Sequence, residues 1–175
     1  SSDLFILWGK TEHKITDNGV QALCASLQAL PSLEEIHLSF KGCKGVTNQS
    51  LSYIREAVKG LLHIDAMTLN LNSCSITDSG TIEIKEIFKT LPNLKILSLS
   101  LTNDEKITRE GFKHLGQGLA ELKRLERLYL NLSGCFEFCD ESAQELHQAF
   151  MQLTRLKRLV LGLTECWRLT DKGTE

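Results

Sequence analysis

Six five-residue stretches recur along the chain, and in most of them apolar residues alternate with polar ones. These stretches are FILWG from Phe5, IHLSF from Ile36, MTLNL from Met67, LSLSL from Leu97, LYLNL from Leu128 and LVLGL from Leu159. A period of two is typical of a β-strand with one buried face, because successive side chains point to opposite sides of a sheet. The pattern therefore predicts six strands, with the regularly spaced leucines on the buried face.

Between these stretches the spacing of apolar residues becomes helical. Examples are Val20, Leu23, Leu27 and Leu30, and again Phe112, Leu115, Leu119 and Leu122. Residues three and four positions apart lie on the same side of an α-helix, so each set forms one apolar stripe. The chain is therefore predicted to alternate between strands and amphipathic helices.

A short motif related to ITDNG recurs just before each helical stretch. It begins at Ile15, Val46, Ile76, Ile107, Phe138 and Leu169, with successive spacings of 31, 30, 31, 31 and 31 residues. So constant a period indicates a repeat architecture, whose units bury their apolar faces only by stacking on one another. We predict an α/β array with five or six parallel strands in one curved sheet and helices on the outer face.

Two positions of this motif have predicted structural roles. Thr16, Thr47, Thr77 and Thr108 stand where the extended chain turns into helix. A hydroxyl there can accept a hydrogen bond from an unpaired N–H of the first turn, so we expect these threonines to be helix N-caps. The residue three positions after the threonine is small, which predicts close packing against the neighbouring repeat. It is Gly19, Ser50, Gly80, Gly111 and Ser142 in the first five copies.

The repeat resembles the leucine-rich repeat family, most closely its ribonuclease-inhibitor-like class. The wording CSITDSG around Cys74 is also similar to the cysteine-containing class found in many F-box proteins. The resemblance covers essentially all of residues 1–175 and implies a solenoid, a right-handed β-α superhelix, with strands on the concave face. We expect a single array of about five and a half repeats, belonging to a longer protein because the sequence opens on Ser1.

Four of the six cysteines occupy one column of the repeat: Cys43, Cys74, Cys135 and Cys166. The same column holds Asp104 in the fourth repeat. No C-x-x-C pair occurs, and the histidines fall in unrelated columns, so the pattern does not favour a metal site. We predict buried, reduced thiols that pack under the loops between strand and helix, with disulfides between adjacent repeats as the alternative.

Composition narrows the function classes further. A net charge of −2 gives no general attraction to nucleic acid, and no apolar run approaches the roughly 20 residues of a membrane helix. No nucleophile–base pair or phosphate loop is visible, so we predict no enzyme activity and no cofactor or metal. With no signal peptide visible, we expect a cytoplasmic protein that binds neither nucleic acid nor membranes.

The candidate binding residues lie mainly on the face that the strands turn away from the helices. Small polar residues dominate this face, and aromatic residues and arginines interrupt them. Large aromatic side chains and arginines are enriched among the residues that dominate binding energy at interfaces. The candidates are Trp8, His37, Asn70, Ser100, Tyr129 and Asn131 on the face, Arg127 and Arg158 along its edge, and Trp167 on a loop.

These features favour a protein–protein interaction scaffold that presents its concave strand face to a protein partner. The alternatives are a structural component of a large cytoskeletal or ciliary assembly, and the substrate-receptor arm of a ubiquitin ligase. The residues before each strand change from acidic at Glu34 and Glu35 to basic at Lys157 and Arg158. Opposite charges of this kind could also support end-to-end or edge self-association.

Overall fold

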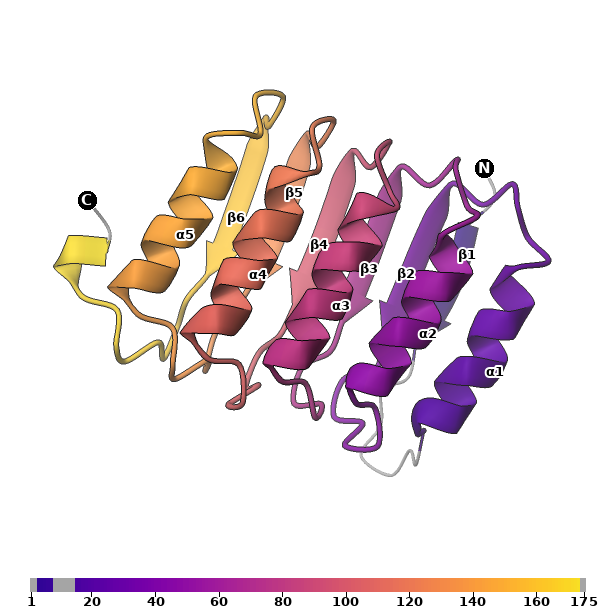
Figure 1. The fold of residues 1–175 in the computed structure, drawn as a ribbon, viewed down its shortest axis with the longest axis horizontal. Helices are drawn as coiled ribbons and strands as arrows, with labels where there is room; N and C mark the ends of the chain where they lie inside the picture. The colour runs from indigo at the N-terminus through magenta and orange to yellow at the C-terminus, as the bar shows by residue number, and fades with distance from the viewer. Residues whose placement is uncertain (1–2, 8–14, 174–175) are drawn as a thin grey trace.

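The computed structural model describes residues 3–7 and 15–173, and in this part of the chain six strands form one parallel sheet in the order β1 to β6 (Figure 1). The strands are Asp3–Leu7 (β1), Glu35–Ser39 (β2), Ala66–Asn70 (β3), Ile96–Ser100 (β4), Arg127–Asn131 (β5) and Arg158–Gly162 (β6). The helices are Asp17–Leu27 (α1), Asn48–Val58 (α2), Asp78–Lys89 (α3), Arg109–Ala120 (α4), Asp140–Phe150 (α5) and the 3-10 turn Asp171–Gly173 (η1). The predicted α/β repeat array is confirmed.

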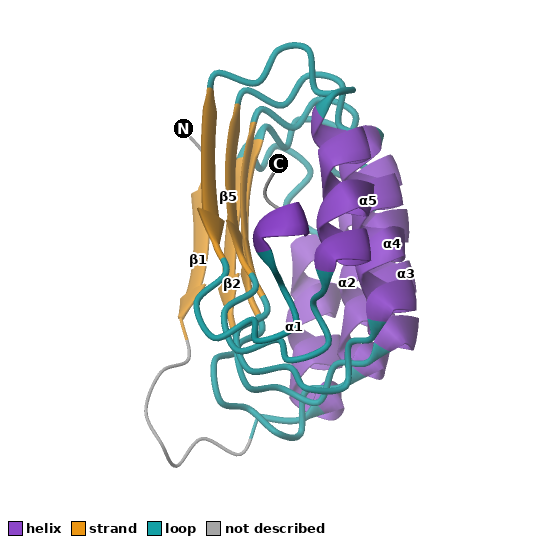
Figure 2. Ribbon diagram, turned by 90° about the vertical axis from the view of Figure 1, so that its left-hand side faces the viewer, coloured by secondary structure: helices purple, strands orange, loops and turns teal. Residues whose placement is uncertain are grey.

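All five α-helices lie on one side of the sheet, and loops join the two layers at both ends of the strands (Figure 2). Neighbouring strands are about 4.8 Å apart, whereas an α-helix with its side chains is about 10 Å wide. Stacking the same number of each therefore makes the strand side the shorter, concave one. We call this side the strand face; it consists of the side chains that the strands direct away from the helices.

The sheet register corrects the prediction for the first repeat. Phe5 lies opposite His37 and Ile6 opposite Leu38. The sequence pattern instead aligned Ile6 with His37, one residue out, which exchanges the two faces of a strand. Ile6 therefore does not belong to the column of His37. Trp8, the other candidate in this repeat, lies outside the described residues.

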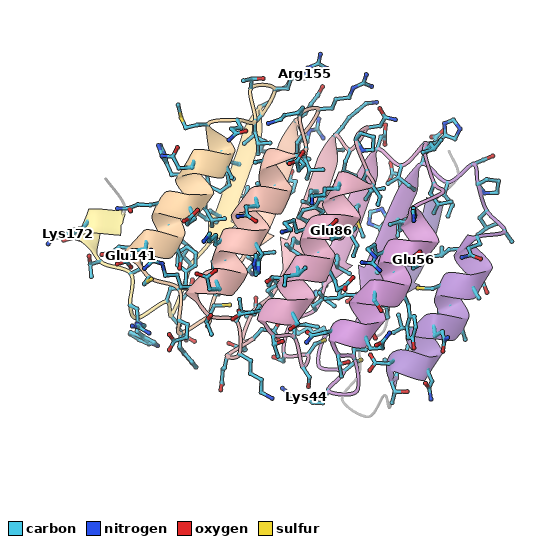
Figure 3. All side chains as sticks on the ribbon, in the orientation of Figure 1. Lys44, Glu56, Glu86, Glu141, Arg155 and Lys172 are labelled. Carbon is cyan, nitrogen blue, oxygen red and sulfur yellow. The ribbon has the colours of Figure 1, made fainter. Side chains whose placement is uncertain are left out.

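The two loop edges of the array carry different residues (Figure 3). Arg155 lies at the edge where the chain returns from a helix to the next strand, and Lys44 lies at the opposite edge, where strands lead into helices. In the described loops that lead from a strand into a helix, one position has a positive φ, which favours glycine. It is occupied by Gly42, Ser73, Asn103, Gly134 and Glu165, with φ values from 54° to 79°.

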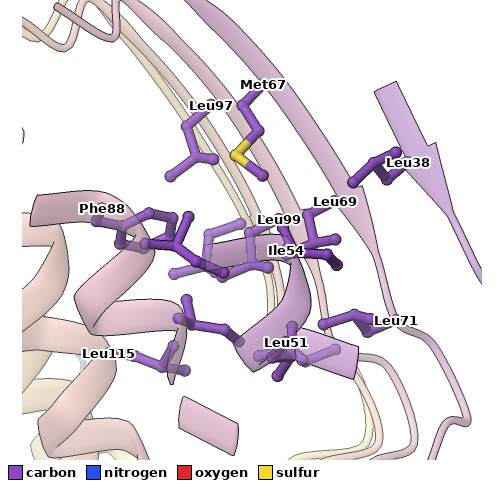
Figure 4. Close-up of a cluster of buried hydrophobic side chains, with 14 of the residues drawn as sticks. Leu38, Leu51, Ile54, Met67, Leu69, Leu71, Phe88, Leu97, Leu99 and Leu115 are labelled. Atoms are coloured by element: carbon purple, nitrogen blue, oxygen red, sulfur yellow. The ribbon is translucent and has the colours of Figure 1, made fainter. Parts of the chain in front are cut away.

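The core lies between the two layers and runs through all of the repeats. Leu69, Leu97 and Leu99 from the strands meet Ile54, Phe88 and Leu115 from the helices (Figure 4). Each of these side chains is at most 1% exposed. Phe138, in the loop that leads into α5, is also fully buried, and its ring packs edge-on against that of Phe112 with 4.9 Å between the ring centres.

The motif threonines occupy the N-cap positions of their helices as predicted, but the predicted side-chain hydrogen bond to the first turn forms only at Thr47. Thr47 accepts a hydrogen bond from its own helix, whereas the Thr16, Thr77 and Thr108 side chains do not. Instead, an aspartate or asparagine side chain of the previous repeat forms hydrogen bonds with the threonine. Asp78 accepts from the backbone N–H of Thr108 at 2.8 Å and from its hydroxyl at 2.6 Å. These bonds tie each repeat to the next, because the two residues are 30 positions apart.

The same connection recurs along the array as a series of rungs. Asp17 binds Thr47, Asn48 binds Thr77, Asp78 binds Thr108 and Asp140 binds Thr170. The small residues fit beside these rungs as predicted. A side-chain carbon on Gly111 would come within 2.3 Å of an Asp78 oxygen, and one on Gly80 within 2.4 Å of Asn48.

One rung is replaced. Between the fourth and fifth repeats, Arg109 stands in the aspartate position and Cys139 in the threonine position. A guanidinium offers no acceptor for a hydroxyl or an N–H. The two departures from the motif therefore belong together, since a threonine at position 139 would find no partner in the previous repeat.

Restoring both residues should restore the rung. We expect the double variant Arg109→Asp/Cys139→Thr to be more stable than the sum of its single variants predicts, by about 1 kcal/mol, because the hydrogen bonds need both partners. A double-mutant cycle in urea at fixed pH measures this coupling. Strictly additive single and double variants would show that the rungs do not contribute to stability.

Candidate functional site

The strand face is built from columns of residues that the parallel register places side by side. One column runs His37, Thr68, Ser98, Tyr129 and Val160, and the next runs Ser39, Asn70, Ser100, Asn131 and Gly162. A third column begins the strands with Glu35, Ala66, Ile96, Arg127 and Arg158. The sequence candidates on this face are therefore brought onto one surface, except Trp8, which is not described.

The N-terminal half of the strand face is occupied with its own hydrogen bonds. His37 Nδ1 lies 2.9 Å from the Thr68 hydroxyl, and its Nε2 lies 3.2 Å from a carboxylate oxygen of Glu35. Asn70 Oδ1 accepts from the backbone N–H of Asn72 at 3.1 Å. Side chains of neighbouring residues thus engage His37, which is less available to a ligand than the sequence indicated, whereas the amide group of Asn70 keeps its donors.

Ser100 is also part of this internal network. It is half-buried, and its hydroxyl donates to Asn72 Oδ1 at 2.6 Å; the same oxygen accepts from the Thr102 N–H at 2.9 Å. Ser100, predicted as a candidate binding residue, therefore lies on the strand face but is engaged within the molecule. Asn72 links the third and fourth repeats across the face.

The C-terminal half has a different character, because two arginines and an aromatic ring gather there. Arg158 places its guanidinium carbon 5.6 Å from the centre of the Tyr129 ring, within the range of a cation–π interaction. Arg127 lies beside Arg158 in the register. Both arginines are exposed, and neither has a carboxylate within ion-pairing distance in the described part of the chain. This end of the face carries two positive charges that form no direct ion pair with a described residue.

Next to the arginines lies an open hollow. Its lining consists of Ser98, Leu99, Ser100, Tyr129, Leu130, Asn131, Val160 and Gly162. Gly162 helps to form it, because a side-chain carbon there would lie 2.6 Å from Asn131 Oδ1. Val160 is 45% exposed and supplies an apolar wall. The sequence did not single out Val160 or Gly162, although glycine stands in a column otherwise filled by serine and asparagine.

The edge where strands begin is largely neutralised by pairs between adjacent repeats. Lys95 binds Asp65 and Lys157 binds Glu126, each at 2.9 Å. The hydrogen bond from Lys157 lowers the pKa of the Glu126 carboxyl, and the charge of Lys157 adds to the effect. Acidic and basic residues along this edge are thus largely paired with each other within the molecule. Arg127 and Arg158 do not belong to these ion pairs.

Trp167 lies away from this group. It is 76% exposed on the loop after β6, at the far end of the strand from Arg158. Phe136 occupies the same position one repeat earlier and is 40% exposed. Trp167 therefore belongs to a loop surface distinct from the one that holds Tyr129, and the predicted set of site residues divides in two.

The cysteine column is confirmed as buried, although the sulfur atoms bond to a neighbour and not only to their own loop. Cys74 donates to the carbonyl of Phe40 at 3.1 Å and Cys135 to that of Leu101 at 3.2 Å. Burial raises the pKa of both thiols to about 12. All six cysteines lie in the described residues and are free thiols. Thiols with so high a pKa are poor nucleophiles.

Asp104 replaces cysteine in this column and is the most unusual buried group. It is 2% exposed, and neither carboxyl oxygen forms a hydrogen bond with a described residue. Burial raises the pKa of this carboxyl to about 8, while the charge of Lys44 and the nearby N–H of Ile76 oppose the rise. The carboxyl is therefore mostly protonated at neutral pH.

Other kinds of site find no support in the described part of the chain. Residues 3–7 and 15–173 contain no group of three or more histidine, cysteine or acidic residues placed to hold a metal ion. Within the same residues, no helix has the length and apolar character needed to cross a membrane.

Comparison with known proteins bears on the fold. The C-terminal domain of tropomodulin from Caenorhabditis elegans superimposes with a TM-score of 0.58 and 18% identity, over 83% of this chain and 82% of that one. This chain has a leucine-rich-repeat-like fold. The likeness extends to architecture alone at this level of identity. A TLR13–ssRNA13 complex also overlaps, with a TM-score of 0.32 and 14% identity over 88% of this chain and 28% of that one.

The sequence relatives add less. FERM domain-containing protein C from Dictyostelium discoideum is 27% identical over 105 residues, which is 60% of this chain and 7% of that protein. No family model matches the chain, and no catalytic family is thereby identified.

Proposed function

We propose that this leucine-rich-repeat-like array is a non-enzymatic scaffold that binds another protein on the strand face, at β4 to β6. The observation that carries this proposal is the group formed by Tyr129, Arg127 and Arg158 beside an open hollow. Exposed tyrosine and arginine side chains are frequent centres of binding energy. A rigid sheet also holds them in place before binding, which limits the entropy lost on association.

The finer identity of the scaffold is proposed on sequence grounds. The alternating strands and the cysteine column support assignment to the ribonuclease-inhibitor-like or cysteine-containing class, although the period of 30–31 residues exceeds the usual 20–29 of leucine-rich repeats. An intracellular location is proposed with it, because buried free thiols suit a reducing compartment. Roles in a cytoskeletal or ciliary assembly, or in a ubiquitin ligase, would use the same kind of recognition surface and stay hypotheses.

Site-specific photocrosslinking tests which face binds. A photoreactive amino acid replaces Ser98 on the strand face in one variant and the exposed Gln144 on α5 in the other. We expect the Ser98 position to yield a defined crosslinked protein and the Gln144 position to yield none. Defined crosslinks from Gln144 alone would place recognition on the helices and contradict the proposal.

With the crosslinked partner purified, Tyr129 becomes the decisive residue. Tyr129→Ala should weaken binding by at least about 1 kcal/mol, roughly fivefold, because the ring supplies contact area and positions Arg158. Arg158→Glu should mainly slow association and change its dependence on salt. Calorimetry and stopped-flow measurements separate the two effects. Unchanged binding in both variants would move the interface to the loop surface around Phe136 and Trp167.

A further inference from the structure

The exposed charge of the strand face is strongly uneven. Among its described positions, the acidic residues are Asp3 and Glu35, which lie opposite each other in the register of β1 and β2 at the N-terminal end. The corresponding positions at β5 and β6 are Arg127 and Arg158, two and three strands beyond Ala66 in the register. A ligand on β4 to β6 therefore meets positive charge without any acidic side chain on the face to oppose it.

The polar groups beside the arginines are also mostly donors. The Asn131 carbonyl oxygen is already occupied by the Ser133 N–H at 3.1 Å, which leaves its amide group free to donate. The hydroxyls of Tyr129 and Ser98 make no hydrogen bond to a described residue and can either donate or accept. The arginines and the Asn131 amide group favour a ligand that brings acceptors, and the carboxylates of a protein ligand form strong, often bidentate pairs with arginine.

The geometry also indicates the shape of the ligand. Arg127 and Arg158 begin neighbouring strands about 4.8 Å apart, and alternate residues of an extended chain are about 7 Å apart. Two flexible arginine side chains can span that interval. The Tyr129 ring and Val160, two residues further along each strand, provide an apolar surface directly beyond them.

We propose that the strand face at β4 to β6 binds an extended, acidic segment of another protein. The segment presents two carboxylates on one side to Arg127 and Arg158 and an apolar side chain to Tyr129 and Val160. This inference rests on the proposed function and adds the chemical class of the partner.

The test uses two short fluorescent peptides and the full chain. In one peptide, glutamate occupies every second position and a leucine comes after the last glutamate. The other peptide has lysine in place of each glutamate. We expect the glutamate peptide to bind, with NMR shift changes centred on Tyr129 and Asn131, and the lysine peptide not to bind. Arg127→Glu/Arg158→Glu should lose at least about tenfold in affinity, because both contacts become repulsive.

The matched control is Arg124→Glu/Arg155→Glu, which changes net charge equally on exposed residues of the return loops. It should keep its affinity within about twofold, since screened charges off the face contribute little. Equal losses in both double variants would mean unspecific attraction and overturn the inference. Equal binding of both peptides would also overturn the inference. Self-association that depends on the same arginines and is not displaced by the glutamate peptide would overturn it too, because a second copy of the chain would then occupy the surface. In each of these cases crosslinking from Ser98 still tests the scaffold function independently.

Discussion

Leu99→Ala should lower the free energy of unfolding by about 2–5 kcal/mol, the range observed when a buried leucine is emptied. Leu99 is 1% exposed and lies between Leu69 and Leu130 in the register, facing the helices. Interiors of proteins are close-packed, so its neighbours cannot collapse fully into the space that the side chain leaves. Urea titration followed by circular dichroism measures the loss.

The neighbouring position provides the control. Ser98 belongs to the same strand but lies on the strand face, half-buried and without a hydrogen bond to a described residue. Ser98→Ala should therefore change stability by less than about 0.5 kcal/mol. Ser100→Ala should fall between the two, because it removes the bond to Asn72. Similar losses at Leu99 and Ser98 would show that the strand is turned by one residue.

Asp104→Asn should stabilise the protein increasingly as pH rises. The folded-state pKa of Asp104 is raised from 3.8 to about 8 by burial, so between these values the folded protein holds a proton that the unfolded chain releases. The contribution of Asp104 to the free energy of unfolding is thus most favourable at low pH and falls as pH increases through this window. The advantage of the amide variant should grow by roughly 2–4 kcal/mol between about pH 5 and pH 9.

The groups around Asp104 support this assignment. The thiols of Cys74 and Cys135, on either side of it, have pKa values raised to about 12 and stay neutral over the range. The charge of Lys44 opposes the rise in the Asp104 pKa without cancelling it. Urea titrations of both proteins at several pH values give the difference directly, and other titrating groups cancel in it.

Asp140→Asn is the matched control. Hydrogen bonds from Thr170 lower the pKa of Asp140, so this carboxyl is ionised in both states above about pH 5. Its replacement should shift stability by the same amount across that range. Parallel curves for the wild type and Asp104→Asn would show that the buried carboxyl does not titrate with a raised pKa.

Much of the fold follows from local patterning. The alternation at Leu97 and Leu99 and the helical spacing at Phe112 and Leu115 each describe a single element, and both predictions agree with the structure. The first repeat shows the limit of the method. Five residues from Phe5 do not alternate cleanly, so the register of β1 depended on its partner strand and was predicted one residue out.

The predicted site was reshaped by contacts between repeats. His37 and Ser100 looked as available as Asn131 in sequence, yet side chains 2 to 31 residues away engage them in hydrogen bonds. The sequence placed Lys157 on a possible binding edge, but in the structure it forms an ion pair with Glu126. The pairing of strands in the sheet shows that Tyr129, Arg127 and Arg158 form one group and that Trp167 lies elsewhere.

By itself the sequence determined the repeat length, the order of strands and helices and most residues of the core, although Leu30, Leu159 and Leu161 of the predicted apolar faces are exposed. These depend on the period of apolar residues, a property that short stretches of chain carry alone. The tertiary structure decided which polar groups are used up inside the array. The motif threonines meet acceptors about 30 residues earlier, and Asp104 is enclosed by the adjacent repeats. Hydrogen bonding and burial of a polar side chain depend on neighbours in space, and stacking brings together residues that the sequence holds a whole repeat apart.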